Sequence, residues 1–378
     1  MASHSDLDGS GYFLYHSIGM FPGKDERIAA ALARIATLWG TANDAQWAQS
    51  LEIRQRFIAR WSDVIGAPAG TLTTAENVTT ALYSIIGGLP ERYLSGRKLL
   101  IAADCFPSLH FLLSGMAERR GFTLHTVPLR PGEYWVRDED FIAHWDTDVG
   151  VALLTWVTST ASHRCDLGAL VKHGRSMGSL VGVDITQGVG IVPFDVPAAD
   201  ADFVVASTLK WLCGVAGAGV LQVRDRLLRE CRPELRGWFA QENPFDWALD
   251  SFAYAPDVRR FDHGTPSVFS CAACLPALEW YAQQDPAALQ AHNRRLVEAL
   301  LDGYAELGLE LASPAAAEQR GGSVMFRLPA GRDPAAVVAA LREQDVFTDC
   351  RGTTLRVSPG NVTTVAGVDR LLRALRNG

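Results

Sequence analysis

The chain has 378 residues, 48% of them hydrophobic and 20% charged, a balance that is ordinary for a globular protein able to form more than one domain. Its net charge of −7 and its lack of basic clusters disfavour a nucleic-acid or anionic-membrane partner. No apolar run approaches the roughly 20 residues that cross a bilayer, and the polar N-terminus is unlike a signal peptide. We therefore expect a soluble cytoplasmic protein.

The cysteine content is consistent with this location. Seven scattered cysteines, an odd number, are most simply explained as reduced thiols in a cytoplasmic protein. Cys271 and Cys274 form a CxxC pair, which can indicate a metal or redox site. The pair lies in an Ala/Leu-rich stretch with no second ligand pair at zinc-site spacing. We interpret it as part of a buried helix and expect no metal.

Residues 1–65 are predicted to form an N-terminal arm with helices that pack with the C-terminal domain. Apolar side chains recur there at helical spacing, namely Ile28, Leu32, Ile35 and Trp39.

Residues 66–255 are predicted to form a large cofactor-binding domain. Short apolar strands alternate with helices in this segment, and the strand candidates are 98–102, 123–127, 149–155, 180–184 and 203–206. Runs rich in Val, Ile, Leu and Phe are typical of strands buried on both faces of a mainly parallel sheet. The segment is therefore predicted to be an α/β domain built on such a sheet.

Residues 256–378 are predicted to form a small α/β domain that ends the chain. A helix near 272–306 precedes two strands, 323–328 and 354–357, and two helices, 334–343 and 365–376. The Ala-rich segment 312–317 reads as a surface loop.

Two polar residues follow neighbouring predicted strands of the large domain. Asp184 ends the strand 180–184, and Lys210 lies 26 residues later, just past the next strand. Open α/β sheets bind ligands at the carboxyl ends of their strands. Alone, such an Asp is most often a helix cap and such a Lys a solvated charge. Together they meet the needs of pyridoxal 5′-phosphate (PLP), which requires a carboxylate for its pyridinium nitrogen and a desolvated lysine that forms a Schiff base.

A phosphate site is predicted at the start of the helix that follows residue 77. Asn77, Val78 and Thr79 offer backbone N–H groups and small polar side chains there, as phosphate-binding helix N-termini do. A plain helix cap is the alternative.

Three further residues complete the predicted site. Phe106, after the strand 98–102, can lie flat on the pyridine ring, or it can be a core aromatic residue. Arg356 lies on a predicted strand of the small domain, where its guanidinium can bind a substrate carboxylate unless it is a surface charge. Gln187 is expected beside the ring, where its amide can hydrogen-bond the cofactor or the protein backbone.

These residues, in this order, resemble PLP enzymes of fold type I in the class V aminotransferase group, and the kynureninase family in particular. Residues 12–19 (YFLYHSIG) are similar to the kynureninase opening YFLGNSLG, and 105–110 (CFPSLH) to its FPSDH segment. Residues 182–184 (GVD) match the strand with the pyridine-binding Asp, and 208–212 (TLKWL) match SYKYL, with its Schiff-base lysine. The resemblance implies that Thr208 and Lys210 both belong to the cofactor site.

The resemblance continues into the last third of the chain. Residues 236–239 (RGWF) are similar to a GWF segment, which implies that Trp238 lies near the cofactor phosphate. Residues 264–266 (GTP) match a segment that reaches the partner subunit's cofactor, which implies a homodimer with shared sites and a role for Thr265. Residues 349–351 (DCR) and 355–359 (LRVSP) resemble DKR and IRVAP, whose Arg binds the substrate carboxylate.

The sequence departs from the kynureninase pattern on the reactive side. Leu209 stands where that family has Tyr, Gln187 where it has His, and Leu109 where it has Asp. Residues 155–162 lack the catalytic Tyr of that family and instead resemble HITSPTA of isopenicillin N epimerase, while 76–82 (ENVTTAL) resemble its NATTAL. Kynurenine hydrolysis needs a base and oxyanion donors, and these replacements deplete them.

We therefore expect a PLP-dependent enzyme in which a small L-amino acid or S-substituted amino acid forms an imine with the cofactor. Lys210 is expected to move the α-proton, and the side chain is then cleaved, as in lyases of biosynthetic pathways. Epimerisation, transamination and decarboxylation-coupled deamination start from the same imine and stay open. Cysteine desulfuration would require Cys350 as a thiolate, although the loop before Arg356 is short for that reaction. A non-catalytic binding protein on the same scaffold would have no need of Lys210.

Overall fold

The computed structural model describes residues 8–377, and a seven-stranded sheet forms its largest layer. The strand order is β1-β7-β6-β5-β4-β2-β3. Strands β2, β3, β4, β5 and β6 run parallel to one another, whereas β7 is antiparallel to β6 and β1 is antiparallel to β7. The strands are β1 (Leu72–Ala75), β2 (Lys98–Ala102), β3 (Thr123–Val127), β4 (Val149–Thr155), β5 (Leu180–Asp184), β6 (Phe203–Ser207) and β7 (Gly219–Val223).

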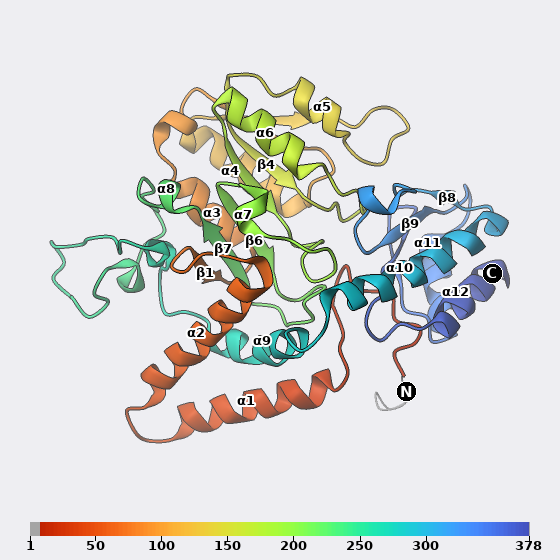
Figure 1. Ribbon diagram of the computed structural model, residues 1–378, viewed down its shortest axis with the longest axis horizontal. Helices are drawn as coiled ribbons and strands as arrows, with labels where there is room; N and C mark the ends of the chain where they lie inside the picture. Colours follow the sequence, from red (N-terminus) through yellow and green to blue (C-terminus); the bar gives the residue numbers. More distant parts are fainter. Residues whose placement is uncertain (1–7, 378) are drawn as a thin grey trace.

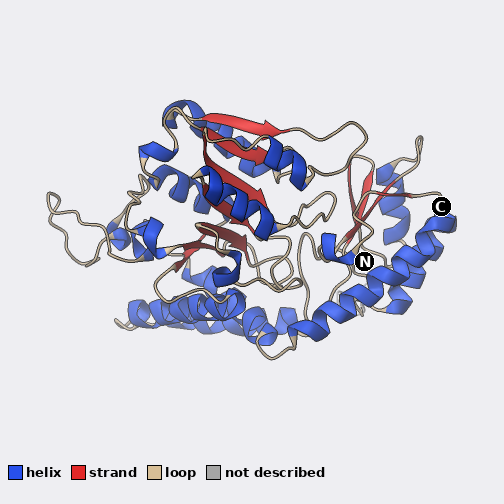
Figure 2. Cartoon of the chain, turned by 45° about the horizontal axis from the view of Figure 1, so that its top comes forward, coloured by secondary structure: helices blue, strands red, loops and turns tan. Residues whose placement is uncertain are grey.

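Helices cover both faces of this sheet (Figures 1 and 2). One face packs against α3 (Val78–Gly88), α4 (Pro107–Arg120) and α8 (Asp225–Leu228). The other face packs against α2 (Gln46–Ile65), α5 (Asp138–Ala143), α6 (Leu167–Met177), α7 (Val196–Ala199) and α9 (Val268–Tyr281). The central parallel strands are therefore covered on both faces, which explains why β2, β4, β5 and β6 read as nearly continuous apolar runs.

The small domain is a four-stranded antiparallel sheet with helices packed on it. The strand order is β10-β11-β9-β8, and the elements are α10 (Pro286–Gly303), β8 (Glu310–Leu311), β9 (Val324–Arg327), α11 (Pro334–Arg342), β10 (Asp349–Arg351), β11 (Thr354–Val357) and α12 (Val365–Asn377). Its own apolar cluster joins the helices to the sheet.

The predicted elements of the two domains are largely confirmed, with two corrections. The five predicted strands of the large sheet are all present, but β1, β7, β8 and β10 were not predicted. They are short, and β7 follows a glycine-rich stretch that reads as a loop. The single helix predicted near 272–306 is two helices, because Asp285 caps α10 and Pro286 occupies its first position, where proline starts a new helix.

The N-terminal segment divides between the two domains. The arm before α1 (Lys24–Gly40) pairs with the small domain, where Tyr12 and Leu14 bridge to Phe347 and Ser358. Helices α1 and α2 were expected to pack with the C-terminal domain together with the arm, and this prediction is wrong. They pack instead against α9, and α2 joins the core of the large sheet. Long amphipathic helices bury more apolar surface against α9 and the large sheet than they could against the small domain.

Helix α9 also belongs by its contacts to the large domain. Cys271 and Cys274 of the CxxC pair are buried in this helix and pack in the apolar cluster of the large sheet. The buried-helix interpretation of this pair is confirmed. Judged by these contacts, the boundary between the two domains lies between α9 and α10. The sequence had placed it earlier, at residue 256.

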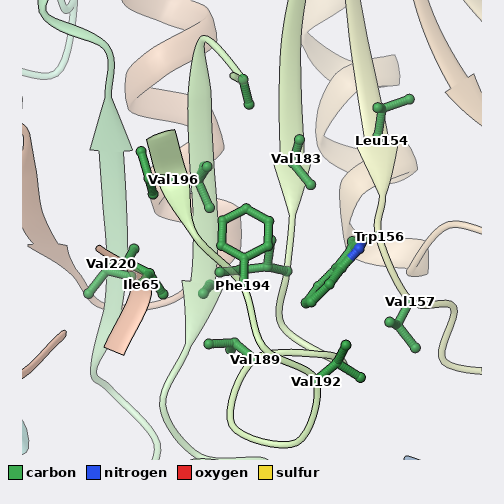
Figure 3. Close-up of a cluster of buried hydrophobic side chains, with 14 of the residues drawn as sticks. Ile65, Leu154, Trp156, Val157, Val183, Val189, Val192, Phe194, Val196 and Val220 are labelled. Carbon is green, nitrogen blue, oxygen red and sulfur yellow. The ribbon is translucent and has the colours of Figure 1, made fainter. Parts of the chain in front are cut away.

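A dense apolar cluster supports the loops that leave the carboxyl ends of β4 and β5 (Figure 3). Trp156, directly after β4, packs edge-to-face on Phe194, with ring centroids 4.9 Å apart. Val189 and Val192, in the segment after β5, lie in the same cluster. This packing fixes the strand ends at which polar residues gather.

Candidate active site

A cavity of about 700 Å³ lies at the carboxyl ends of the central parallel strands. Its floor includes Thr155, Asp184 and Ser207, the last residues of β4, β5 and β6. The N-terminus of α3, the loop before α4, the N-terminal arm and the small-domain strands β10 and β11 form its walls. Both the position and the size are typical of a ligand site in an α/β protein.

Most of the residues predicted for the site line this cavity. They are Asn77, Val78, Thr79, Phe106, Asp184, Gln187, Lys210 and Arg356. The structure therefore brings together residues that are up to 279 positions apart in the chain, from Asn77 to Arg356.

Lys210 lies in the loop after β6, and its amine faces two charged groups and one ring. Its Nζ lies 5.3 Å from the centroid of the Phe106 ring. Burial lowers the pKa of Lys210, the charge of Asp184 opposes this, and the charge of Arg356 adds to it, so that the pKa is about 8. Because the uncharged amine is the nucleophile, this environment favours imine chemistry near neutral pH.

Asp184 is held at the end of β5 by the turn that follows. Its Oδ1 accepts a hydrogen bond of 2.9 Å from the backbone N–H of Thr186. Burial raises the pKa of Asp184, while hydrogen bonding to Thr186 and the charge of Lys210 lower it. A buried carboxylate with so few cationic neighbours is suited to pairing with a protonated ring nitrogen.

The start of α3 combines a helix cap with free backbone donors. Asn77 is the N-cap residue, and it forms reciprocal hydrogen bonds with Thr80. The N–H groups of Val78 and Thr79, in the first turn, have no acceptor within the helix. Since both residues line the cavity, the cap and the predicted phosphate site are compatible features of one helix start.

Phe106 is not a core residue, because 44% of it is exposed and its ring borders the cavity. It immediately precedes Pro107, the first residue of α4. Proline fixes the chain direction at the helix start, and the residue before it is held in an extended conformation. The alternative of a core aromatic is therefore excluded, and the ring is available to a ligand.

Arg356 is only 5% exposed, so it is not a surface charge. It pairs with Asp349 of the adjacent strand through Nε to Oδ1 at 2.8 Å and Nη2 to Oδ2 at 2.5 Å. Its Nη1 donates to the carbonyl oxygen of Ser159 at 3.3 Å.

Of the two roles considered for Gln187, a hydrogen bond to the cofactor or to the protein backbone, its side chain forms the backbone hydrogen bond. Its side-chain amide donates to the carbonyl oxygen of His16 at 3.1 Å, which ties the N-terminal arm to the loop after β5. The residue also lines the cavity, beside Asp184.

Three predicted cofactor-binding residues do not line the cavity in this chain. The Thr208 hydroxyl donates to the carbonyl oxygen of Ala218 at 2.6 Å and accepts from the Trp61 indole at 3.1 Å. Trp238 packs edge-to-face on Trp47, and Thr265 is exposed to solvent. For Thr208 the reason is the strand pleat, because consecutive side chains at the end of β6 point to opposite sides and Ser207 takes the cavity side.

Several polar residues of the cavity were not predicted from the sequence. His16 and Ser17 enter it from the arm, and Thr155 and Thr186 lie beside Asp184. The signal for the threonines was available, since Thr155 ends a predicted strand and Thr186 is two residues past another. His16 and Ser17 belong to the segment 12–19 that resembles the kynureninase opening, but their place in the cavity depends on the path of the arm, which the motif does not indicate.

The residues of the cavity fit PLP. The hydroxyl oxygen of Thr155 is buried and has no hydrogen-bond partner among the described residues. A buried polar atom without a partner is costly, so this hydroxyl is suited to a polar ligand. Asp184, the helix start at Val78 and the amine of Lys210 match the ring nitrogen, the phosphate and the aldehyde of the cofactor in charge and donor type.

Fold and site together define a PLP-dependent enzyme. The chain belongs to the aminotransferase class-V family, whose pattern it matches over residues 49–371. It is 30% identical to a kynureninase from Deinococcus radiodurans, with 98% of this chain and 92% of that protein covered. It is 27% identical to an isopenicillin N epimerase from Streptomyces clavuligerus, with 82% of this chain and 81% of that protein covered.

Solved structures confirm the fold expected from the resemblance. A cystine C–S lyase in complex with its reaction product, cysteine persulfide, superposes with a TM-score of 0.87 at 21% identity, covering 98% of both chains. The same lyase has been solved as a variant with glycine covalently linked to PLP. A cysteine desulfurase from Thermococcus onnurineus NA1 gives a TM-score of 0.85 at 18% identity, covering 97% of this chain and 93% of that one.

Proposed function

We propose that the protein cleaves the side chain of a small or S-substituted L-amino acid, with Lys210 as its catalytic residue. One observation carries this proposal. The amine of Lys210, the carboxylate of Asp184 and the guanidinium of Arg356 face a single cavity at the strand ends. These are the groups that must act together on an amino acid at a PLP site.

Each of the three groups has a distinct task in this proposal. Arg356 binds the substrate carboxylate, and Lys210 accepts and returns the proton of the α-carbon. Asp184 stabilises the positive charge of a protonated pyridine nitrogen. PLP, when bound, supplies the electron sink that makes the α-proton acidic.

The walls of the cavity support a substrate with an uncharged side chain. Leu109, Val157 and Leu209 face the cavity together with Phe106. Among the described residues, Asp184 is the single acidic residue of the lining. An apolar or sulfur-containing side chain fits such a wall better than a charged one, which would lose its hydration there.

Two relatives support side-chain cleavage, and a third supports an alternative. Kynureninase and a cystine C–S lyase, by their names, act on amino-acid side chains. Epimerisation is the second candidate, because 155–162 resembles the epimerase and Thr155, Ser159 and Thr160 of this segment line the cavity.

Cysteine desulfuration is disfavoured by the position of Cys350. Side chains alternate along β10, so Asp349 and Arg351 lie on the side of Arg356, while Cys350 packs against the apolar cluster of the small domain. Burial raises the pKa of Cys350 to about 11, with Asp349 adding to the effect. A protonated thiol on the far side of the strand is not placed to attack a substrate sulfur.

The experiment is to incubate the holoenzyme with S-methyl-L-cysteine in D2O and to follow the mixture by proton NMR. Cleavage of the side chain predicts methanethiol, pyruvate and ammonia, with one water consumed. Epimerisation predicts intact amino acid that carries deuterium at the α-carbon and has lost its optical purity. L-kynurenine is tested in parallel, and anthranilate from it would assign the reaction of the kynureninase family instead.

We also propose a homodimer and a cytoplasmic location. Thr265 would then act at the partner's site, as the resemblance implies for residues 264–266, and we propose the same for Trp238, since neither residue lines the cavity of its own chain. The location is supported by the seven cysteines, all of them unpaired. Within residues 8–377, no helix combines the length and the apolar character needed to cross a membrane.

A further inference from the structure

A hydrogen-bond cluster of mostly buried residues surrounds Arg356. Its centre is Asp349, the register partner of Arg356 across the β10–β11 pair. Beside the two bonds from Arg356, Asp349 Oδ1 lies 3.0 Å from Nε2 of His16. His16 comes from the N-terminal arm, so the cluster joins parts of the chain that are 333 residues apart.

The hydrogen-bond directions in this cluster follow from the charges. Burial lowers the pKa of His16 to about 4, so its imidazole is neutral near pH 7. Burial by itself raises the pKa of Asp349, but hydrogen bonds from His16 and Arg356 outweigh it and hold that pKa below its usual range. An ionised carboxylate only accepts, so Nε2–H of His16 donates to Asp349.

The other imidazole nitrogen is then an acceptor. Nδ1 lies 2.6 Å from Oγ of Ser358, which therefore donates to it. Oγ of Ser323 lies 2.6 Å from the same hydroxyl and is left as its donor. The chain from Ser323 through Ser358 and His16 to Asp349 has one consistent set of donors and acceptors.

A count of the donors of Arg356 shows what this arrangement leaves free. A guanidinium has five N–H donors. Asp349 accepts two of them and the Ser159 carbonyl accepts one, among the described residues. Two N–H groups, one on each Nη, remain for a ligand in the cavity, which is the number that a bidentate carboxylate accepts.

We propose that Asp349 is a positioning residue for substrate binding, oriented by His16. It holds the guanidinium of Arg356 by its Nε side and leaves the two Nη hydrogens directed to the α-carboxylate of an amino acid. This inference rests on the proposed role of Arg356. His16 stands where the kynureninase opening has Asn, so the hydrogen bond from an imidazole to Asp349 is a feature of this chain's own sequence.

The test uses the visible absorbance of the holoenzyme, titrated with L-alanine and, separately, with L-alaninol. L-alaninol has the same amine but a hydroxymethyl group in place of the carboxylate. The variants are Asp349→Asn, Arg356→Lys, their double variant and His16→Leu. Asp202→Asn is the control, because Asp202 is likewise paired to an arginine, Arg175, but lies at the other end of β6. Its side chain is fully buried, whereas that of Asp349 is 24% exposed.

We expect Asp349→Asn and Arg356→Lys each to weaken L-alanine binding about tenfold or more, because a charge-assisted hydrogen bond is lost or misdirected. Binding of L-alaninol should stay within about twofold of wild type. The double variant should bind L-alanine no more weakly than Arg356→Lys alone, since the two residues act as one unit. His16→Leu should show a smaller loss of L-alanine affinity. It tests the same inference if Asp349→Asn does not fold.

The remaining outcomes separate the inference from the proposed function. If Arg356→Lys loses L-alanine affinity and both Asp349→Asn and His16→Leu keep it, the positioning role is wrong and the role of Arg356 stands. Equal losses for L-alanine and L-alaninol would mean that Asp349 has a general structural role, which also overturns the inference. Unchanged affinity in Arg356→Lys, or no response of the wild type to L-alanine, would overturn the proposed function as well.

Discussion

Ser207 and Thr208 are adjacent hydroxyl residues at the end of β6, and the structure gives them opposite environments. Ser207 lines the cavity, whereas the Thr208 hydroxyl bridges Trp61 and the Ala218 carbonyl in the protein interior. The sequence shows both hydroxyls but not which one the pleat turns toward the ligand. Site residues on a strand can therefore be predicted to within one position, and the side has to come from the structure.

This difference predicts opposite effects for two conservative substitutions. Ser207→Ala should weaken PLP retention with little change in the free energy of unfolding of the apoprotein. Thr208→Val should lower that free energy by about 1–3 kcal/mol, because the Trp61 donor and the Ala218 acceptor lose a buried partner. Urea unfolding of the apoprotein and PLP titration measure the two quantities, and the reverse pattern would place the cofactor on the Thr208 side.

The environment of Lys210 predicts the pH dependence of its reaction with the cofactor. Burial lowers the pKa of Lys210 to about 8, and the amine reacts only when it is uncharged. Covalent attachment of PLP to the apoprotein, trapped with borohydride, should therefore become faster as the pH rises, with a midpoint near 8. A midpoint near 10.5, the ordinary value for lysine, would show that the amine is not desolvated.

At the level of elements, four of the five predicted parallel strands were found because they are short apolar runs that are mostly buried, namely β2, β4, β5 and β6. The fifth, β3, lies at the edge of the sheet and is only partly buried. The missed strands β1 and β7 pair antiparallel at one edge of the sheet, and β1 contains two threonines in four residues. Short strands of mixed polarity carry too little periodicity to be separated from loops.

The N-terminal arm resembles the kynureninase opening in sequence, but that resemblance did not indicate what the arm contacts. Gly19 donates its N–H to the carbonyl oxygen of Leu209, in contact with the loop that carries Lys210. A Cβ at Gly19 would lie 1.8 Å from the carbonyl oxygen of Lys210, so a side chain there must displace backbone. The arm is therefore a direct support of the Lys210 loop.

The close approach of the arm predicts the effect of Gly19→Ala. The extra methyl group should push the arm and the Lys210 loop apart, lowering the free energy of unfolding by about 1–3 kcal/mol or more and weakening PLP retention. Gly40→Ala is the matched control, because a Cβ at Gly40, the last residue of α1, meets nothing within 4 Å. Thermal unfolding and PLP titration of both variants check this, and equal behaviour of the two would contradict the assigned contact.

At the scale of the whole molecule, a group of large apolar side chains is exposed on one extended segment. The segment that follows the short helix 238–240 extends from the large domain (Figure 1). Phe245, Trp247 and Leu249 are exposed there, Trp247 by 75%. Clustered exposed aromatic residues are typical of protein interfaces, and a second copy of this chain is the partner that the site resemblance implies.

We therefore expect the holoenzyme to sediment as a dimer. Replacing Phe245 and Trp247 by serine should shift the equilibrium toward monomer, because their apolar surface would no longer be buried at the interface. Sedimentation velocity over a range of protein concentrations measures this shift. A monomeric wild type that retains PLP would contradict the proposal of a shared site.

Much of the architecture could be predicted because fold and chemistry depend on the same strand ends. Asp184 and Lys210 are close in sequence and lie on adjacent elements, so their meeting could be inferred. The pairing of Asp349 with His16 could not, since it depends on how the arm crosses the small domain. The position of α9 with the large sheet was missed for the same reason, because an apolar helix does not reveal which of two cores it joins.

The central claim is that Lys210 is the residue that holds PLP covalently in this cavity. The most direct test is the visible absorbance of purified protein saturated with PLP and freed of excess cofactor, for the wild type, Lys210→Ala and the control Lys172→Ala. Lys172 is exposed on α6, away from the cavity lining. We predict a yellow band in the wild type and in Lys172→Ala that shifts when an amino acid is added, and no such band in Lys210→Ala. A wild-type band that survives unchanged in Lys210→Ala, or is absent from the wild type, would contradict the assignment of Lys210.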